Sequence, residues 1–175
     1  MTNGEESAMD VVTGAQVAVG LTVPVSRERM WELITAVERI GEWSPETIGG
    51  SWDEPARVPA AGTRFTAHNR FPDGQIGTVT CVITEARPPS AFAWTVLDAG
   101  GLVGSAWRYE LREGVEPGTT LVYHSFTHGP GMTGARTRAE ADPQELGTRL
   151  VTLCRNMTTT IGAMAATTTA MGASR

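Results

Sequence analysis

The chain has 175 residues, a length typical of one domain and sufficient to bury an apolar core without a disulfide or a structural metal. Its net charge is −5, whereas a protein that binds nucleic acid usually presents a basic surface. All 14 cationic residues are arginine, so Schiff-base catalysis and P-loop chemistry, which both need lysine, are excluded. We therefore expect a protein without a nucleic-acid partner.

Two further features of the composition concern the cellular compartment. No stretch approaches the roughly 18 to 20 apolar residues of a membrane span, and Glu5, Glu6 and Asp10 stand where a signal peptide would carry basic residues. The two cysteines, Cys81 and Cys154, lie far apart in the sequence and form no CxxC pair. These observations predict a soluble, cytoplasmic protein with reduced thiols and no integral membrane association.

Residues 1–13 are polar or small without periodicity and predict a flexible tail ahead of a single domain over 14–170. Apolar residues then alternate over 15–23, which is the period of a half-buried strand. After this strand, Ser26 can cap a helix over about 27–39. The helix carries a stripe of apolar residues at helical spacing: Met30, Leu33, Ile34 and Val37.

The middle of the chain consists of short strand-like runs separated by turn residues. An irregular run over 48–52 leads into five regular ones. Connections this short pair neighbouring strands antiparallel, because a parallel crossover requires about a dozen residues or more. The five regular runs are centred on Phe65, Val82, Trp94, Tyr109 and Tyr123.

The last part of the chain predicts a loop followed by a long helix. Residues 129–141 are glycine-rich and lack a period, so we expect a structureless loop that could act as a lid. Asp142 then provides a helix N-cap, with Pro143 at the first helical position and Glu145 completing a capping box. The helix should extend to about residue 168 along one apolar stripe: Leu146, Leu150, Leu153, Met157, Ile161 and Met164.

This order of elements resembles the helix-grip (SRPBCC) superfamily, which includes START lipid-transfer domains, birch-pollen-allergen-like proteins and polyketide cyclases. The resemblance extends over about 15–168 and implies an α+β fold, in which a curved antiparallel sheet of six to seven strands wraps a long C-terminal helix. Short motifs are similar to those of small actinobacterial members of the polyketide cyclase/dehydrase type: WSPE at 43–46, GTRF at 62–65, HNR at 68–70, CVITEARP at 81–88, FAW at 92–94 and WRYEL at 107–111.

The resemblance also implies a pocket between sheet and helix, and three functions are compatible with it, because this fold supports many activities. The first is binding of an apolar or aromatic small molecule, lipid- or polyketide-like, by a monomer or homodimer. The second is an aromatase/cyclase in which Tyr109, Tyr123 or Asn69 stabilises an enolate or donates a proton. The third is a non-catalytic, stress- or chaperone-associated interaction module, which would have a filled core and an exposed apolar patch.

Period-two alternation assigns one face of each strand to the helix. On the last strand, the aromatic and apolar residues lead us to place Leu121, Tyr123 and Ser125 inside and His124 outside. Large aromatics interrupted by a few polar side chains are typical of a mainly apolar pocket, although a filled core would give the same pattern. The predicted ligand-binding residues are Phe65, Asn69, Trp94, Trp107, Tyr109, Tyr123, Ser125, Leu153 and Met157.

The polar side chains predict neither a metal nor a cofactor. His68, His124 and His128 are the only histidines, and the alternation places the first two on the outer face, where they cannot join a three-histidine site. Arg70 is expected to face solvent, with a carboxylate or a ligand oxygen at the pocket rim as its alternative partner.

Overall fold

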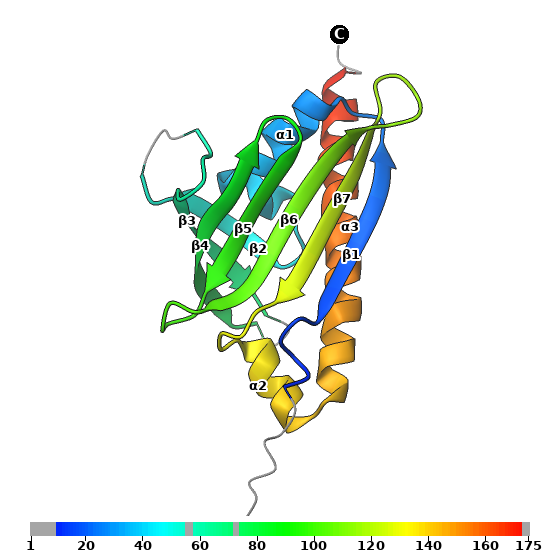
Figure 1. The fold of residues 1–175 in the computed structure, drawn as a ribbon. Coiled ribbons are helices and arrows are strands. Elements are labelled where there is room, and N and C mark those ends of the chain that lie inside the picture. The colour runs from blue at the N-terminus through cyan, green and yellow to red at the C-terminus, as the bar shows by residue number, and fades with distance from the viewer. Residues whose placement is uncertain (1–9, 55–57, 72–73, 173–175) are drawn as a thin grey trace, which may run out of the picture.

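The computed structural model describes residues 10–54, 58–71 and 74–172. Seven strands form one antiparallel sheet in the order β1-β7-β6-β5-β4-β3-β2, so the first two strands of the chain, β1 and β2, lie at its opposite edges (Figure 1). The strands are β1 (Gln16–Val23), β2 (Thr47–Trp52), β3 (Arg64–Arg70), β4 (Ile76–Arg87), β5 (Ala91–Leu97), β6 (Val103–Glu113) and β7 (Thr120–His128).

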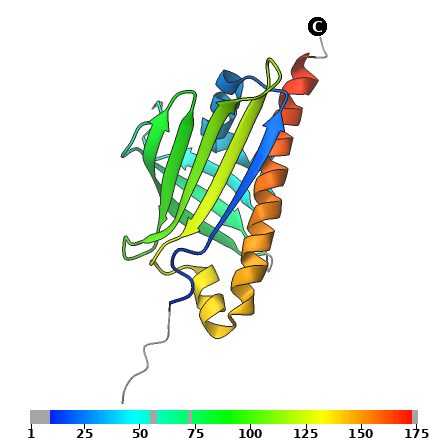
Figure 2. The same cartoon turned by 45° about the vertical axis from the view of Figure 1, so that its right-hand side comes forward.

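The helices cover one face and one end of this sheet. The longest helix, α3, runs along the concave face, and α2 lies beside its N-terminal end (Figures 1 and 2). This arrangement is the predicted α+β helix-grip fold. The helices are α1 (Arg27–Thr35), the 3-10 helix η1 (Val37–Glu42), α2 (Gly134–Ala141) and α3 (Gln144–Gly172).

The first helix begins as predicted and ends earlier. The Ser26 hydroxyl accepts a hydrogen bond from the Arg29 amide at 3.3 Å, which satisfies one of the free amides of the first turn. The backbone leaves the helical region at Ala36, with φ −79° and ψ 67°, and continues as η1. All four residues of the predicted stripe are buried: Met30, Leu33, Ile34 and Val37.

The C-terminal helix confirms the apolar stripe and extends to Gly172. The Asp142 carboxylate accepts a hydrogen bond from the Gln144 amide at 3.0 Å, while the Asp142 amide donates to the Arg138 carbonyl that ends α2. Asp142 therefore caps two helices at once. The stripe is buried at Leu153, Met157, Ile161 and Met164 and half-buried at Leu146 and Leu150.

Two segments differ from the predicted loop and tail. The segment 129–141 contains helix α2, so the prediction of a structureless loop was wrong. The Thr133 hydroxyl caps the first turn of α2 by accepting a hydrogen bond from the Arg136 amide at 3.0 Å. The predicted tail also packs near its end, because Val12 is only 2% exposed and Asp10 binds Arg136. Residues 1–9 lie outside the described ranges.

The core is filled at the end of the sheet where α1 packs. Side chains from α1, β6, β7 and α3 meet there with almost no exposed area. The largest fully buried side chains at this end include Met30, Leu33, Leu111, Val122, Ile161 and Met164.

None of the helices in the described ranges combines the length and the hydropathy of a membrane span.

Candidate ligand-binding cavity

A cavity of about 240 Å³ lies between the sheet and α3, in the half of the molecule next to α2. On β6, Tyr109 lines this cavity, whereas Leu111 belongs to the filled core. On α3, Met157 lines it, whereas Ile161, one turn further along, does not. The filled core therefore forms the floor of the cavity, and the N-terminal turns of α3 lie towards its mouth.

The sheet side of the cavity is a continuous aromatic wall. Trp94 and Trp107 lie parallel, with ring centroids 6.1 Å apart and an interplanar angle of 4°. Phe126 meets Trp107 edge to face at 4.8 Å, and Phe65 meets Trp94 in the same manner at 6.2 Å. Aromatic rings offer flat apolar surface with defined stacking geometry, which favours a planar apolar ligand.

Tyr109 and His124 form the last part of this wall before the filled core. They are register partners on β6 and β7, and their rings stack with centroids 3.7 Å apart and an interplanar angle of 5°. Nδ1 of His124 bonds to the carbonyl of Arg108 at 3.1 Å. Burial lowers the pKa of His124 to about 4 and raises the pKa of Tyr109 above its usual value, so both groups are neutral at pH 7.

The opposite end of the cavity is polar. Arg149 of α3 donates two hydrogen bonds to the carboxylate of Glu46, at 2.7 and 2.6 Å, and the Asn156 amide donates a third at 3.1 Å. Two lining residues of α2, Gly134 and Arg138, are exposed to solvent. We therefore place the mouth between α2 and this half-buried ion pair.

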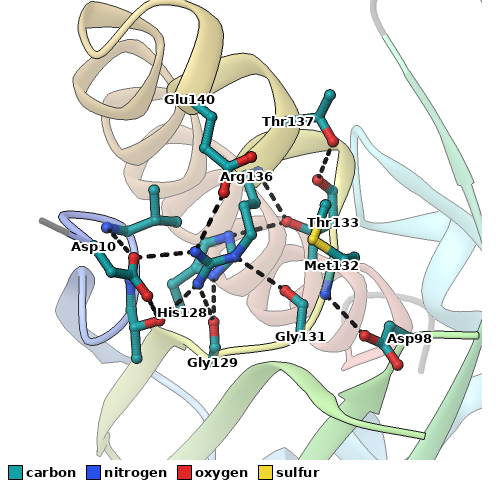
Figure 3. A network of polar contacts seen from close by, with 12 residues as sticks. Asp10, Asp98, His128, Gly129, Gly131, Met132, Thr133, Arg136, Thr137 and Glu140 are labelled. Carbon is teal, nitrogen blue, oxygen red and sulfur yellow. Dashed lines mark hydrogen bonds and ion pairs between the residues drawn. The ribbon is translucent and has the colours of Figure 1, made fainter. Parts of the chain in front are cut away.

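Helix α2 is held in place by a buried arginine. The Arg136 side chain is 6% exposed and donates to the carbonyl oxygens of Gly129 and Gly131, at 2.9 and 3.2 Å (Figure 3). It also donates to the Asp10 carboxylate at 3.0 Å and to the Thr13 hydroxyl at 2.6 Å. Hydrogen bonds from Thr13 and Arg136 hold the pKa of Asp10 well below its usual range. The N-terminal segment is thereby bonded to the cavity mouth.

His128 links the same network to the cavity wall. Its Nδ1 lies 3.0 Å from the Gly129 carbonyl oxygen, which can only accept, so Nδ1 carries the proton. The Thr133 hydroxyl then donates to Nε2 over 3.0 Å (Figure 3). Burial lowers the pKa of His128, which favours this neutral, fully bonded state. Both Thr133 and His128 line the cavity, so the network also shapes its mouth.

Most of the residues that we predicted as ligand-binding do line the cavity, although their role in binding stays a prediction. Asn69 is among them, and its side-chain oxygen accepts a hydrogen bond from Thr47 at 2.8 Å. Arg70 is exposed and lies outside the lining. The lining residues that were predicted are Phe65, Asn69, Trp94, Trp107, Tyr109, Leu153 and Met157.

The predicted face of β7 was wrong, and with it the placement of Tyr123 and Ser125. Tyr123 is 41% exposed, and its ring covers the backbone of Gly20 on the outer face, beside the guanidinium of Arg112 at 5.3 Å. The inner face carries His124 instead. Neither Tyr123 nor Ser125 lines the cavity, so the proposed acid–base role of Tyr123 has no structural basis.

The polar residues at the mouth were not predicted from the sequence. Arg149 and Asn156 lie two turns apart on α3, but Glu46 comes from a distant segment of the chain, and no sequence spacing relates it to them. Within the described ranges, no three His, Cys, Asp or Glu side chains gather as a metal site. Cys81 lines the cavity, but burial raises the pKa of its thiol to about 12, which keeps it protonated and poorly nucleophilic at neutral pH.

Solved structures of the same fold come from several bacteria. A protein from Mycobacterium smegmatis is 19% identical with a TM-score of 0.61, covering 89% of this chain and 92% of its own. A polyketide-cyclase-like protein from Corynebacterium glutamicum is 21% identical with a TM-score of 0.59, covering 86% and 88%. The di-domain ARO/CYC protein of the BE-7585A biosynthetic pathway is 18% identical with a TM-score of 0.55, covering 87% and 49%.

No curated protein sequence matches the chain. The family model for polyketide cyclase/dehydrase and lipid transport proteins matches residues 14–155, which is most of the chain and includes the sheet, α2 and the first turns of α3. The matched segment contains the aromatic wall and the Glu46–Arg149 ion pair at the mouth, and ends just before Asn156. This chain therefore belongs to the polyketide cyclase/dehydrase and lipid transport family.

Proposed function

We propose that the protein binds a planar apolar small molecule, with one or two aromatic rings, in the cavity between the sheet and α3. The observation that carries this proposal is the cavity of about 240 Å³ behind the wall of Trp94, Trp107 and Phe126. An apolar protein cavity of about 150 Å³ is enough to bind benzene, and drug-sized ligands occupy roughly 300 Å³ or more. A ligand the size of naphthalene lies between these limits.

The hollow interior counts against the interaction-module alternative, which requires a filled core. The cyclase alternative has one observation in its favour, because neutral Tyr109 and His124 lie side by side at the floor. Such a pair could exchange protons with a bound enol, and structural similarity to the di-domain ARO/CYC protein is compatible with that role. Binding is common to both functions, and it is therefore the function to test first.

The test is titration of the purified protein with 2-methylnaphthalene by isothermal titration calorimetry. Ala67 is 7% exposed and lines the cavity, so Ala67→Phe should fill part of it. We expect saturable binding with one site, and at least a tenfold loss of affinity in A67F with an unchanged or higher melting temperature.

The matched control is Ala18→Phe, which adds the same side chain at an exposed position of β1. It should bind with wild-type affinity. Binding of equal strength in A67F and the wild type would show that the hydrocarbon binds elsewhere, and no binding at all would contradict the proposed function.

A further inference from the structure

The cavity floor carries hydrogen-bonding capacity that the protein does not use. His124 is 4% exposed, and its Nδ1 points to the Arg108 carbonyl oxygen. A carbonyl oxygen can only accept, so Nδ1 carries the proton and Nε2 keeps a lone pair. No group in the described part of the chain donates to that nitrogen. The nearby indole N–H of Trp107 is already bonded to the Ser105 hydroxyl at 3.0 Å.

The free nitrogen opens into the cavity. Among the described residues, the Nε atom of Arg27 is the only fully buried side-chain nitrogen or oxygen atom without a hydrogen-bond partner. His124 Nε2 has no partner either, so it must be accessible, and the cavity is the space that His124 lines. The same reasoning holds for the hydroxyl of Tyr109. The floor thus presents an acceptor from one ring and a hydroxyl from its stacked neighbour.

The charges around the floor restrict what can bind there. The rings in contact with His124 are those of Trp94, Trp107 and Tyr109, and none carries a charge at neutral pH. Arg149 and Glu46, which form an ion pair among the residues that line the cavity, lie at the mouth. A carboxylate or phosphate at the floor would be buried without a cation, which is strongly unfavourable. A neutral hydroxyl can instead donate to His124 and accept from Tyr109.

We propose that the ligand is a hydroxylated aromatic compound that enters ring first and donates its hydroxyl proton in a hydrogen bond to His124 Nε2 at the cavity floor. This inference rests on the proposed function and specifies the ligand class. The aromatic wall accommodates the ring, and the Tyr109–His124 pair distinguishes the hydroxyl from a methyl group of the same size. His124 is then a specificity-determining residue.

The test compares 2-naphthol with 2-methylnaphthalene, which has nearly the same shape and lacks the donor. Calorimetry gives the ratio of their dissociation constants in the wild type and in His124→Phe. We expect 2-naphthol to be favoured, and we expect that preference to fall at least tenfold in H124F. His124→Gln, whose side-chain oxygen is an acceptor, should restore part of the preference.

Two controls separate the possible outcomes. Phe126→Leu trims the wall without touching a polar atom, so it should weaken both ligands and leave their ratio unchanged. Tyr109→Phe tests the neighbouring hydroxyl. A ratio that H124F leaves intact, or that is lost in Y109F alone, would overturn the role of His124 while binding itself stands. Failure of both ligands to bind would instead overturn the proposed function and this inference with it.

Discussion

His124 should make the stability of the folded protein depend on pH. Its ring is enclosed by Trp94, Trp107 and Tyr109, none of which titrates between pH 4 and 7, and burial lowers its pKa from 6.5 to about 4. The unfolded chain therefore binds the proton before the folded chain does as the pH falls. The stability that is present above pH 6.5 should decline down to about pH 4, by ~3 kcal/mol for this residue.

Urea denaturation at intervals between pH 7 and pH 4 would measure this decline. In His124→Phe, the free energy of unfolding should fall less steeply as the pH is lowered. The decline should not vanish, since the pKa of His128 is also lowered by burial and acts in the same direction. An identical slope in H124F and the wild type would mean that His124 titrates normally.

Tyr123, unlike Tyr109, lies on the outer face of the sheet and does not line the cavity. Its ring lies over Gly20 and beside Arg112, and its hydroxyl has no contact with the cavity. We expect Tyr123→Phe to change the dissociation constant of 2-naphthol by less than twofold and the melting temperature by about a degree, because the ring and its contacts remain. A tenfold loss of affinity would return Tyr123 to the binding site.

The misplaced face of β7 shows why single residues were harder to predict than strands. Apolar side chains occur on both faces of this strand, for example Leu121 outside and Val122 inside. The polar residues of the inner face are acceptable only because each finds a specific partner, as Thr120 does in the Val25 carbonyl at 2.7 Å. The ring of Tyr123 covers a glycine on the neighbouring strand. Such partners depend on register, which the pattern of one strand does not contain.

At the scale of elements, α2 depends on Arg136. We expect Arg136→Met to destabilise the protein by about 2–4 kcal/mol, because the carbonyl oxygens of Gly129 and Gly131 and the Asp10 carboxylate lose their donor. Hydrogen exchange should rise in the amides of α2 and in residues 10–13, and less in the central strands.

Arg155→Met is the matched control for this substitution. Arg155 is an exposed arginine of α3 with no ion pair in the described part of the chain. The R155M variant should show the hydrogen exchange of the wild type and unfold at the same urea concentration. Unchanged exchange in α2 of R136M would mean that other contacts hold this helix.

Helices α2 and α3 differ in how well they could be predicted from the sequence. Helix α3 has strong local signals, namely the Asp142 cap and an apolar stripe of several turns, and its structure confirms both. Helix α2 is eight residues long and mostly polar, and its buried residues are only Arg136 and Ala139. An isolated helix of this length is unstable in water, and it forms here through contacts with residues 10–13 and with α3 that no local pattern reveals.

For the molecule as a whole, the fold was predicted from the order of strands and helices. Short turns impose antiparallel neighbours, and the long amphipathic helix needs the concave face, so the helix-grip fold follows from local patterns and from the family resemblance. Whether the space between them is hollow could not be predicted. The same aromatic residues would surround less space if Ala67, which lines the cavity, were larger.

The uneven filling of the interior has a mechanical consequence. One end of the domain is packed by Leu111, Val122, Ile161 and Met164, whereas the other surrounds about 240 Å³ of space. Compression acts mainly on such space, because close-packed protein yields little volume and internal voids disappear on unfolding. Hydrostatic pressure should therefore loosen the end near α2 while the end near α1 keeps its packing, and a molecule filling the void would make the whole domain less compressible.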